Sequence, residues 1–154
     1  MDYSLDLKFL DVVPLEINNV KEIVILQKSN DFLDGWSESM LIDGFSKGGL
    51  KALGVYHGGI NLIAVITYSY CDVDAEIQDL LVDKAYRKKG IATKLLDKFF
   101  EILKVQKVHK VFLEVREGNK SAINLYQKNG FTLINTRKKY YNGGENALIL
   151  QKTL

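Results

Sequence analysis

The middle of the chain changes from one hydrophobic period to another, and this change predicts a strand followed by a helix. After Glu76, residues 77–82 are mostly apolar and branched, as a buried strand requires. Beyond a polar turn, apolar residues recur at steps of three and four: Ile91, Leu95, Leu96, Phe99, Phe100 and Leu103. This spacing places them on one face of an amphipathic helix. The stretch from Glu76 to Phe100 is therefore predicted to fold as strand, turn and helix.

The N-terminal part of the chain predicts one strand and two helices. Residues 5–10 alternate well enough to form a first strand. Pro14 then stands where a helix can begin, because the missing N–H of proline costs nothing in a first helical turn. The helical pattern continues to Gln27, and a second, short helix is expected after Ser37, ending near Gly44.

Strand patterns recur through the rest of the chain. They cover residues 51–57, 60–70, 108–115, 131–135 and 147–150. The first two flank Gly58-Gly59, which is a strong signal for a two-residue hairpin turn. A helical pattern over residues 120–129 follows Asn119, a good N-cap residue.

The predicted order of elements is strand, two helices, three strands, helix, strand, helix and two strands. Strand–helix alternation in the middle favours parallel pairing there, with antiparallel pairing on either side. We therefore expect a three-layer α/β fold, in which about four helices flank a mixed, twisted sheet of about seven strands. A single domain over residues 1–154 is expected from the length.

Composition and charge argue against several classes of protein. Of 154 residues, 21 are basic and 19 acidic, so the net charge of +2 is too small for a general nucleic-acid binder. One cysteine, Cys71, and two histidines argue against a disulfide and a metal site. No apolar run approaches the roughly 20 residues that span a bilayer, and residues 1–6 are acidic and unlike a secretory signal. A cytoplasmic, soluble protein is expected.

The turn before the central helix has the composition of an anion site. It contains Arg87, Lys88 and Lys89, and then a single glycine, Gly90. The N-terminus of a helix presents unpaired backbone N–H groups and a partial positive charge, so phosphate binds there readily. Gly90 removes the β-carbon where a ligand would touch the backbone. The alternative is a solvated basic turn in front of an ordinary surface helix.

Two segments together resemble the GNAT superfamily of N-acetyltransferases. The run Arg87-Lys88-Lys89-Gly90-Ile91-Ala92 is similar to the acetyl-CoA pyrophosphate loop of that family. A second set of residues resembles the bacterial branch that acetylates the N-terminal alanine of a ribosomal protein: Leu113 to Arg116, Asn119, Ala122-Ile123, Leu125-Tyr126, Gly130-Phe131, Arg137 to Tyr141 and Glu145 to Ala147. The resemblance is clear from about residue 76 onward and weak before it.

The resemblance implies acetyl-CoA as cosubstrate and assigns residues to it. The backbone of Leu80, Leu81 and Val82 would pair with the pantetheine arm, and an N–H near Leu81 would face the acetyl carbonyl. Arg87, Lys88, Lys89, Gly90, Ile91, Ala92 and Thr93 would surround the pyrophosphate, and Asn119 would contact the cofactor from the next helix.

The resemblance also assigns catalytic roles, with Glu114 as general base and Tyr126 as general acid. An α-amino group, with a pKa of about 7.7–8.0, must lose a proton before it attacks a thioester. A carboxylate on a buried strand can take that proton, and a phenol can protonate the departing thiolate. This is direct attack, without an acyl-enzyme.

Other interpretations of these side chains remain open. Glu114 can also pair with Arg116 or a lysine, and Tyr126 can be part of the core. Glu76 is the alternative base. The substrate-binding candidates, Trp36, Tyr140 and Tyr141, can equally be packing aromatics.

The predicted function is acetyl transfer to the N-terminal α-amino group of a protein or peptide, possibly a ribosomal protein. The alternatives are a GNAT enzyme that acts on a small amine and a module that only binds acetyl-CoA. Lys84 stands where the family often has proline, a departure that should not harm phosphate binding. Gly35 precedes Trp36 where the branch tends to have proline, and this second departure puts the acceptor in doubt. Neither the oligomeric state nor the preferred acyl chain follows from the sequence.

Overall fold

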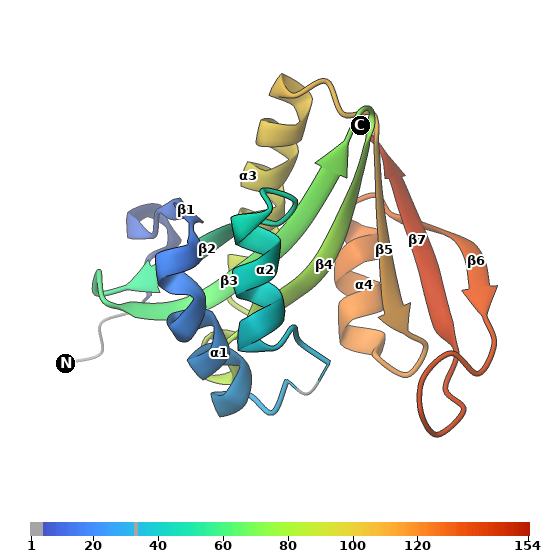
Figure 1. Ribbon diagram of the computed structural model, residues 1–154, viewed down its shortest axis with the longest axis horizontal. Coiled ribbons are helices and arrows are strands. Elements are labelled where there is room, and N and C mark those ends of the chain that lie inside the picture. The colour runs from blue at the N-terminus through green and yellow to red at the C-terminus, as the bar shows by residue number, and fades with distance from the viewer. Residues whose placement is uncertain (1–4, 33) are drawn as a thin grey trace. The chain divides into compact units, whose positions relative to one another are not determined.

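The computed structural model describes residues 5–32 and 34–154 of the chain. These residues form seven strands and four α-helices, and the strands make one mixed sheet in the order β1-β2-β3-β4-β5-β7-β6 (Figure 1). The elements are β1 (Val12–Leu15), α1 (Val20–Ser29), α2 (Glu38–Ser46), β2 (Lys51–His57), β3 (Asn61–Cys71), β4 (Asp74–Val82), α3 (Ile91–Val105), β5 (Lys110–Arg116), α4 (Lys120–Lys128), β6 (Thr132–Arg137) and β7 (Ala147–Thr153). Their order along the chain and the α/β class are as predicted.

The pairing of the strands also follows the prediction. Strand β4 pairs with β5 in parallel, from Asp74 opposite Lys110 to Ile77 opposite Leu113. The pairs β1–β2, β5–β7 and β6–β7 are antiparallel. At the β2–β3 hairpin, Gly58 and Gly59 have φ of +66° and +76°. Two consecutive positive values are the requirement of a type I′ turn, which glycine meets without strain.

The prediction for the first residues is wrong. Residues 5–10 do not form a strand; instead, a short 3₁₀ helix, η1 (Leu7–Phe9), begins after Asp6, whose carboxylate accepts a hydrogen bond from the backbone N–H of Lys8 at 3.0 Å. Pro14 does not start a helix either, because it lies inside β1, opposite Leu53 of β2. Strand β1 is at the edge of the sheet, where the missing N–H of proline is tolerated.

The chain divides into two compact units. The first contains the residues up to Thr67 together with Asp79–Lys98. In it, α1 and α2 lie on the same side of β2 (Figure 1) and bury their apolar faces against the strands. The core of this unit consists of Leu15, Val20, Ile23, Leu26, Leu41, Leu50, Ala52, Leu62, Val65 and Leu81.

The second unit contains Tyr68–Gln78 and Phe99–Leu154. Its core includes a chain of aromatic contacts, in which Tyr68 meets Phe99 edge to face with ring centroids 4.7 Å apart. Phe99 contacts Phe100, which in turn lies 6.1 Å from Phe131. Phe131 meets Tyr126 of α4 edge to face at 5.5 Å. Such geometries are favourable beyond the area that they bury.

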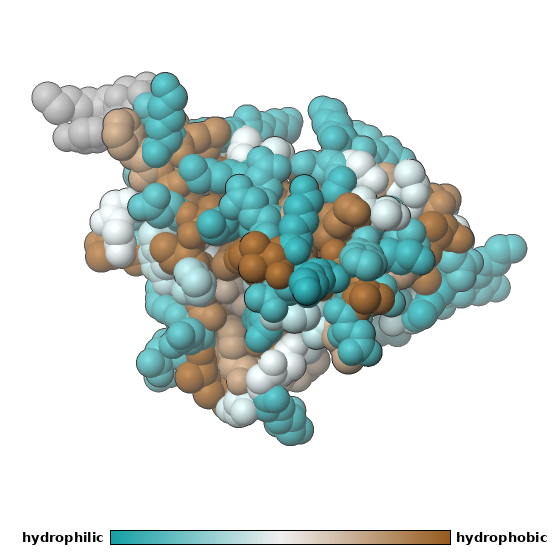
Figure 2. Space-filling model, turned by 90° about the horizontal axis from the view of Figure 1, so that it is seen from above, coloured by the Kyte–Doolittle hydropathy of each residue, from teal (hydrophilic) through white to brown (hydrophobic). Residues whose placement is uncertain are grey.

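The surface mixes charge with scattered apolar side chains. Figure 2 shows hydrophilic side chains over much of one face, with apolar side chains in separate patches among them. Within residues 5–32 and 34–154, no helix is both long and apolar enough to cross a membrane.

Candidate functional site

The segment between β4 and α3 has the geometry of an anion-binding turn. After β4 a short 3₁₀ helix, η3 (Lys84–Tyr86), leads into the turn, and α3 begins at Ile91. The N–H of Lys94 donates to the carbonyl oxygen of Gly90 at 3.1 Å, which is the first hydrogen bond of the helix. The N–H groups of residues 91–93 therefore precede the helical ladder and lie at its positive end.

Two observations favour glycine at position 90. Its φ is +83°, a conformation that other residues adopt only with strain. In addition, a β-carbon at this position would lie 3.1 Å from Cδ1 of Leu7. The N-terminal segment is held close by Lys94, whose Nζ donates to the carbonyl oxygen of Leu7 at 2.8 Å.

Three cationic side chains belong to this turn, and all of them are exposed. Arg87 donates from Nε to the carbonyl oxygen of Val82 at 2.9 Å. Lys88 has a φ of +59°, which is uncommon outside glycine and recurs at ligand-binding turns. Lys89 places Nζ 5.9 Å from the ring of Tyr86. Exposed cations around the first backbone amides of a helix supply the positive charge and the hydrogen-bond donors that a phosphate group requires.

The predicted pantetheine strand is the end of β4. Leu81 is buried, whereas Leu80 and Val82 are half-buried. The N–H of Asp83, directly after the strand, donates to the carbonyl oxygen of Ile63 on β3 at 2.8 Å. The backbone is therefore fixed immediately before it turns toward η3.

Trp36 belongs to the loop between α1 and α2, and its ring packs against the core of the first unit. Its backbone N–H donates to the carboxylate of Asp79 on β4. The Oδ2 atom of Asp79 is buried without a hydrogen-bond partner. Burial raises the pKa of the Asp79 carboxyl to about 6, and the charge of Asp34 acts in the same direction.

Asp79 was not among the predicted site residues, although its position in the strand carries a signal. Asp79 is a charged residue inside a buried strand pattern, where a charge is costly unless it is paired or used.

Glu114 projects from β5 and forms an ion pair. Its Oε1 lies 2.9 Å from Nη1 of Arg137 on β6, and the side chains are 26% and 51% exposed, respectively. The sequence had offered Arg116 or a lysine as alternative partners, and the partner is neither. The Arg137 side chain is more than half exposed, so the pair orients the carboxylate but adds little to stability.

The loop between β6 and β7 is tied to the turn after β5. Arg116 places Nη1 3.0 Å from Oε2 of Glu145, and Oε1 of Glu145 accepts the N–H of Gly118 at 2.9 Å. The Arg116 guanidinium stacks 3.9 Å above the ring of Tyr141. Tyr140 meets Tyr141 edge to face at 5.1 Å, so two of the three predicted substrate-binding aromatics pack against each other.

Tyr140 also links this loop to the Glu114 pair, because the Arg137 guanidinium lies 5.4 Å from the Tyr140 ring.

The remaining predicted residues lie on α4, before it and on β4. Tyr126 is 7% exposed on α4. Asn119 caps α4 as predicted, with Oδ1 accepting the N–H of Ala122 at 3.2 Å. Glu76, the alternative base, is exposed on β4 opposite Phe112 of β5.

The predicted site residues are thus distributed over both units. Leu80 to Val82, Arg87 to Thr93 and Trp36 belong to the first unit, and Glu114, Asn119, Tyr126, Tyr140 and Tyr141 belong to the second.

Residues 17–131 match the model of the acetyltransferase (GNAT) family. The chain belongs to this family. The matched segment includes the turn at Gly90, Glu114 and Tyr126, whereas Tyr140 and Tyr141 lie beyond its end.

Individual relatives support the same grouping. The chain is 34% identical over 93 residues to the [ribosomal protein bS18]-alanine N-acetyltransferase of Haemophilus ducreyi, covering 56% of this chain and 64% of that protein. It is 43% identical over 72 residues to N-alpha-acetyltransferase 50 of Danio rerio, covering 45% and 43%. The chain spans about half the length of the curated relatives it matches.

The fold has close counterparts among solved structures. The crystal structure of the ribosomal-protein-S18-alanine N-acetyltransferase from Escherichia coli superposes with a TM-score of 0.86 at 23% identity, covering 94% of both chains. The GNAT-like fold predicted from the sequence is confirmed.

Proposed function

We propose that the protein is an N-acetyltransferase that transfers the acetyl group of acetyl-CoA to the N-terminal α-amino group of a protein or peptide. The observation that carries this proposal is the turn between β4 and α3, where exposed cations surround the first amides of α3. Family membership supports acetyl-CoA as the ligand of this turn. The proposal treats residues 1–154 as one catalytic domain.

The residues of the turn would hold the pyrophosphate through backbone amides from Lys88 to Thr93, with Arg87, Lys88 and Lys89 supplying charge. The end of β4, from Leu80 to Val82, would bind the pantetheine arm, and Asn119 would add a contact from α4. The cosubstrate supplies a thioester, and the chain supplies orientation and proton transfer.

Glu114 would accept the proton of the attacking amine, directly or through water. Arg137 holds one carboxylate oxygen at 2.9 Å, which orients the group for that role. Tyr126 would donate a proton to the departing thiolate, and the backbone N–H near Leu81 would stabilise the negative charge on the carbonyl oxygen. Glu76 is the alternative base.

The acceptor is proposed from the relatives and from the aromatic side chains. Both the bS18-alanine and the N-alpha-acetyltransferase relatives carry names that specify N-terminal acetylation. Trp36, Tyr140 and Tyr141 would contact the peptide, and an N-terminal alanine of a ribosomal protein is the favoured acceptor. Such an acceptor would place the protein in the cytoplasm.

The proposal is tested by mass-spectrometric detection of acetyl transfer to a mixed panel of acceptors. The panel contains short peptides with varied N-termini, free amino acids and polyamines. Mass detection is preferred to thiol release because the exposed thiol of Cys71 would react with a thiol reagent. We expect acetylation of peptides alone, with peptides that begin with alanine reacting fastest. Modification of small amines alone would contradict the proposal.

A further inference from the structure

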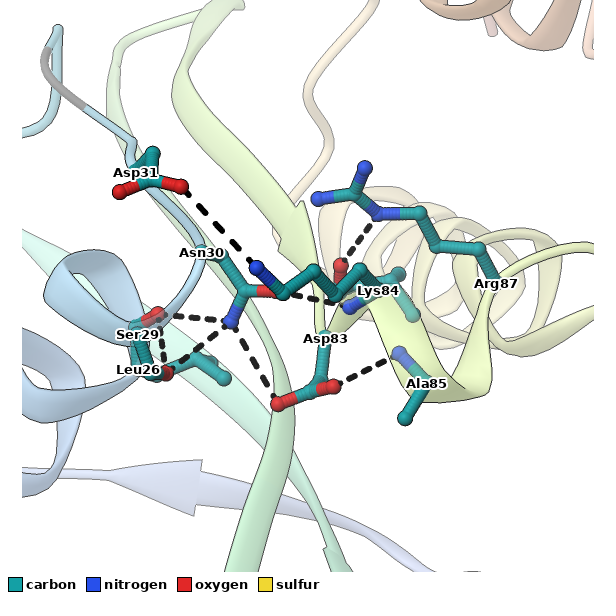
Figure 3. A network of polar contacts seen from close by, with 9 residues as sticks. Leu26, Ser29, Asn30, Asp31, Asp83, Lys84, Ala85 and Arg87 are labelled. Atoms are coloured by element: carbon teal, nitrogen blue, oxygen red, sulfur yellow. Dashed lines mark hydrogen bonds and ion pairs between the residues drawn. The ribbon is translucent and has the colours of Figure 1, made fainter.

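Asn30, at the C-cap of α1, makes contacts far along the chain (Figure 3). Its Oδ1 accepts the backbone N–H of Lys84 at 2.7 Å, across 54 residues of sequence. Its Nδ2 donates to the carbonyl oxygen of Leu26 at 2.9 Å and lies within 3.4 Å of Oδ2 of Asp83. The amide therefore joins the end of α1 to the segment between β4 and the Gly90 turn.

The bond to Lys84 satisfies an N–H that η3 cannot pair internally. Lys84 is the first residue of η3, and the first N–H groups of a helix have no partner within it. Asp83 caps the same helix, with Oδ1 accepting the N–H of Ala85 at 2.8 Å. Asp83 therefore accepts the N–H of Ala85, and Asn30 accepts the N–H of Lys84.

The ion pair in the same region adds little to this link. Nζ of Lys84 lies 4.0 Å from Oδ2 of Asp31, and both side chains are mostly exposed. An exposed ion pair at this distance contributes little to stability, because solvent screens it and both side chains lose freedom in forming it. The short, neutral hydrogen bond from the backbone N–H of Lys84 to Asn30 is the more specific connection.

We propose that Asn30 is a positioning residue for the coenzyme A phosphate turn, because it fixes the backbone from which Arg87 to Gly90 continue. This inference rests on the proposed function of the turn. A shift of about 1 Å in the binding groups is enough to lower activity strongly. Asn30 would therefore act on the affinity for the cosubstrate through η3, without touching it.

The test compares Asn30→Ala with a matched control, Asn129→Ala. Asn129 is the C-cap of α4 and donates from Nδ2 to the carbonyl oxygen of Leu125 at 2.8 Å, the same local bond that Asn30 makes to Leu26. We expect Asn30→Ala to raise the dissociation constant of coenzyme A, measured by titration calorimetry, about tenfold. Asn129→Ala should change it by less than about twofold.

A second variant distinguishes positioning from a general loss of stability. Proline is favoured at the first residue of a helix and has no N–H, so Lys84→Pro removes the group that needs Asn30. Asp83, with φ of −51° and ψ of 132°, already has a conformation that proline accepts in the preceding residue. We expect Asn30→Ala with Lys84→Pro to bind coenzyme A as tightly as Lys84→Pro alone, even if Asn30→Ala alone does not fold.

Steady-state kinetics give an independent measure. Asn30→Ala should raise KM for acetyl-CoA and leave KM for the acceptor unchanged at saturating acetyl-CoA. Unchanged coenzyme A binding in Asn30→Ala, or weaker binding in the double variant than in Lys84→Pro, would overturn the inference. A wild-type protein that does not bind coenzyme A would instead overturn the proposed function.

Discussion

Asp79 is a half-buried residue with a buried carboxylate oxygen, Oδ2, and its titration bears on the stability of the chain. Its pKa is raised from 3.8 to about 6 by burial, so between these values the folded protein holds a proton that the unfolded chain has released. The contribution of Asp79 to the free energy of unfolding is therefore largest at low pH and falls as the pH rises from about 4 to 6. The total fall is about 3 kcal/mol, at 1.36 kcal/mol for each unit of pKa.

Asp79→Asn should remove this fall, because the amide does not titrate. We expect the free energy of unfolding of the variant, relative to wild type, to increase by about 3 kcal/mol between pH 4 and pH 7. Urea denaturation across this pH range measures it. The exposed Asp97→Asn serves as control for the loss of a carboxylate as such. Parallel pH profiles for Asp79→Asn and wild type would contradict the assignment.

Glu114 and Glu76 compete for the role of general base, and the neutral, isosteric substitution separates them. If Glu114 takes the proton, Glu114→Gln should lower kcat by about 10²–10⁴-fold, the usual range for a general base. Affinity for coenzyme A should remain, because Glu114 is not among the residues proposed to hold it. Glu76→Gln, at the alternative position, should keep most of the activity. The measurement is kcat by mass-spectrometric detection of the acetylated product. A much lower kcat in Glu76→Gln than in Glu114→Gln would identify Glu76 as the base.

At the level of elements, Gly90 has a positive φ and also belongs to the proposed binding turn. Gly58 has a positive φ but lies outside that turn, so comparing the two glycines distinguishes the backbone effect from the binding effect. Gly58, with φ of +66°, has nothing within 4 Å of its would-be β-carbon, whereas Gly90, with φ of +83°, has Leu7 at 3.1 Å. Alanine in this conformation costs about 1–2 kcal/mol at either position.

We therefore expect Gly58→Ala and Gly90→Ala to lose similar stability in urea denaturation, with Gly90→Ala losing somewhat more. Only Gly90→Ala should weaken coenzyme A binding in calorimetry, because a β-carbon moves the turn that carries the first amides of α3. Equal coenzyme A affinity in the two variants would show that the turn does not hold the phosphate groups.

The elements were predictable where their signal is local. The periodicity around residues 76–100 and the Gly58-Gly59 pair each depend on neighbouring residues. The strand–turn–helix and the hairpin that they predict are both present, although three residues rather than two separate β2 from β3. The start of the chain was not predictable in this way. Strand β1 is defined by pairing with β2, from Val12 opposite Val55 to Leu15 opposite Ala52. A four-residue edge strand containing proline has no periodic pattern of its own.

At the level of the whole molecule, the partners of individual side chains were not predictable from the sequence, because they lie far away along the chain. The ion pair of Glu114 with Arg137 and the hydrogen bond of Asn30 to Lys84 join residues that are 23 and 54 positions apart. The family resemblance pointed to Glu114, but residue type and local spacing do not identify the partner of a side chain. The Gly90 turn was predictable as a candidate site because its chemistry lies within one continuous segment.

The proposed reaction transfers an acetyl group to an N-terminal α-amino group. The most direct measurement uses a peptide that begins with alanine and contains an internal lysine, together with the same peptide with a blocked N-terminus. Both are incubated with acetyl-CoA and the wild-type protein, and tandem mass spectrometry locates the added acetyl group. The account predicts acetylation of the first peptide at its α-amino group alone and none of the blocked peptide. Acetylation at lysine in either peptide, or none in both while coenzyme A is bound, would contradict it.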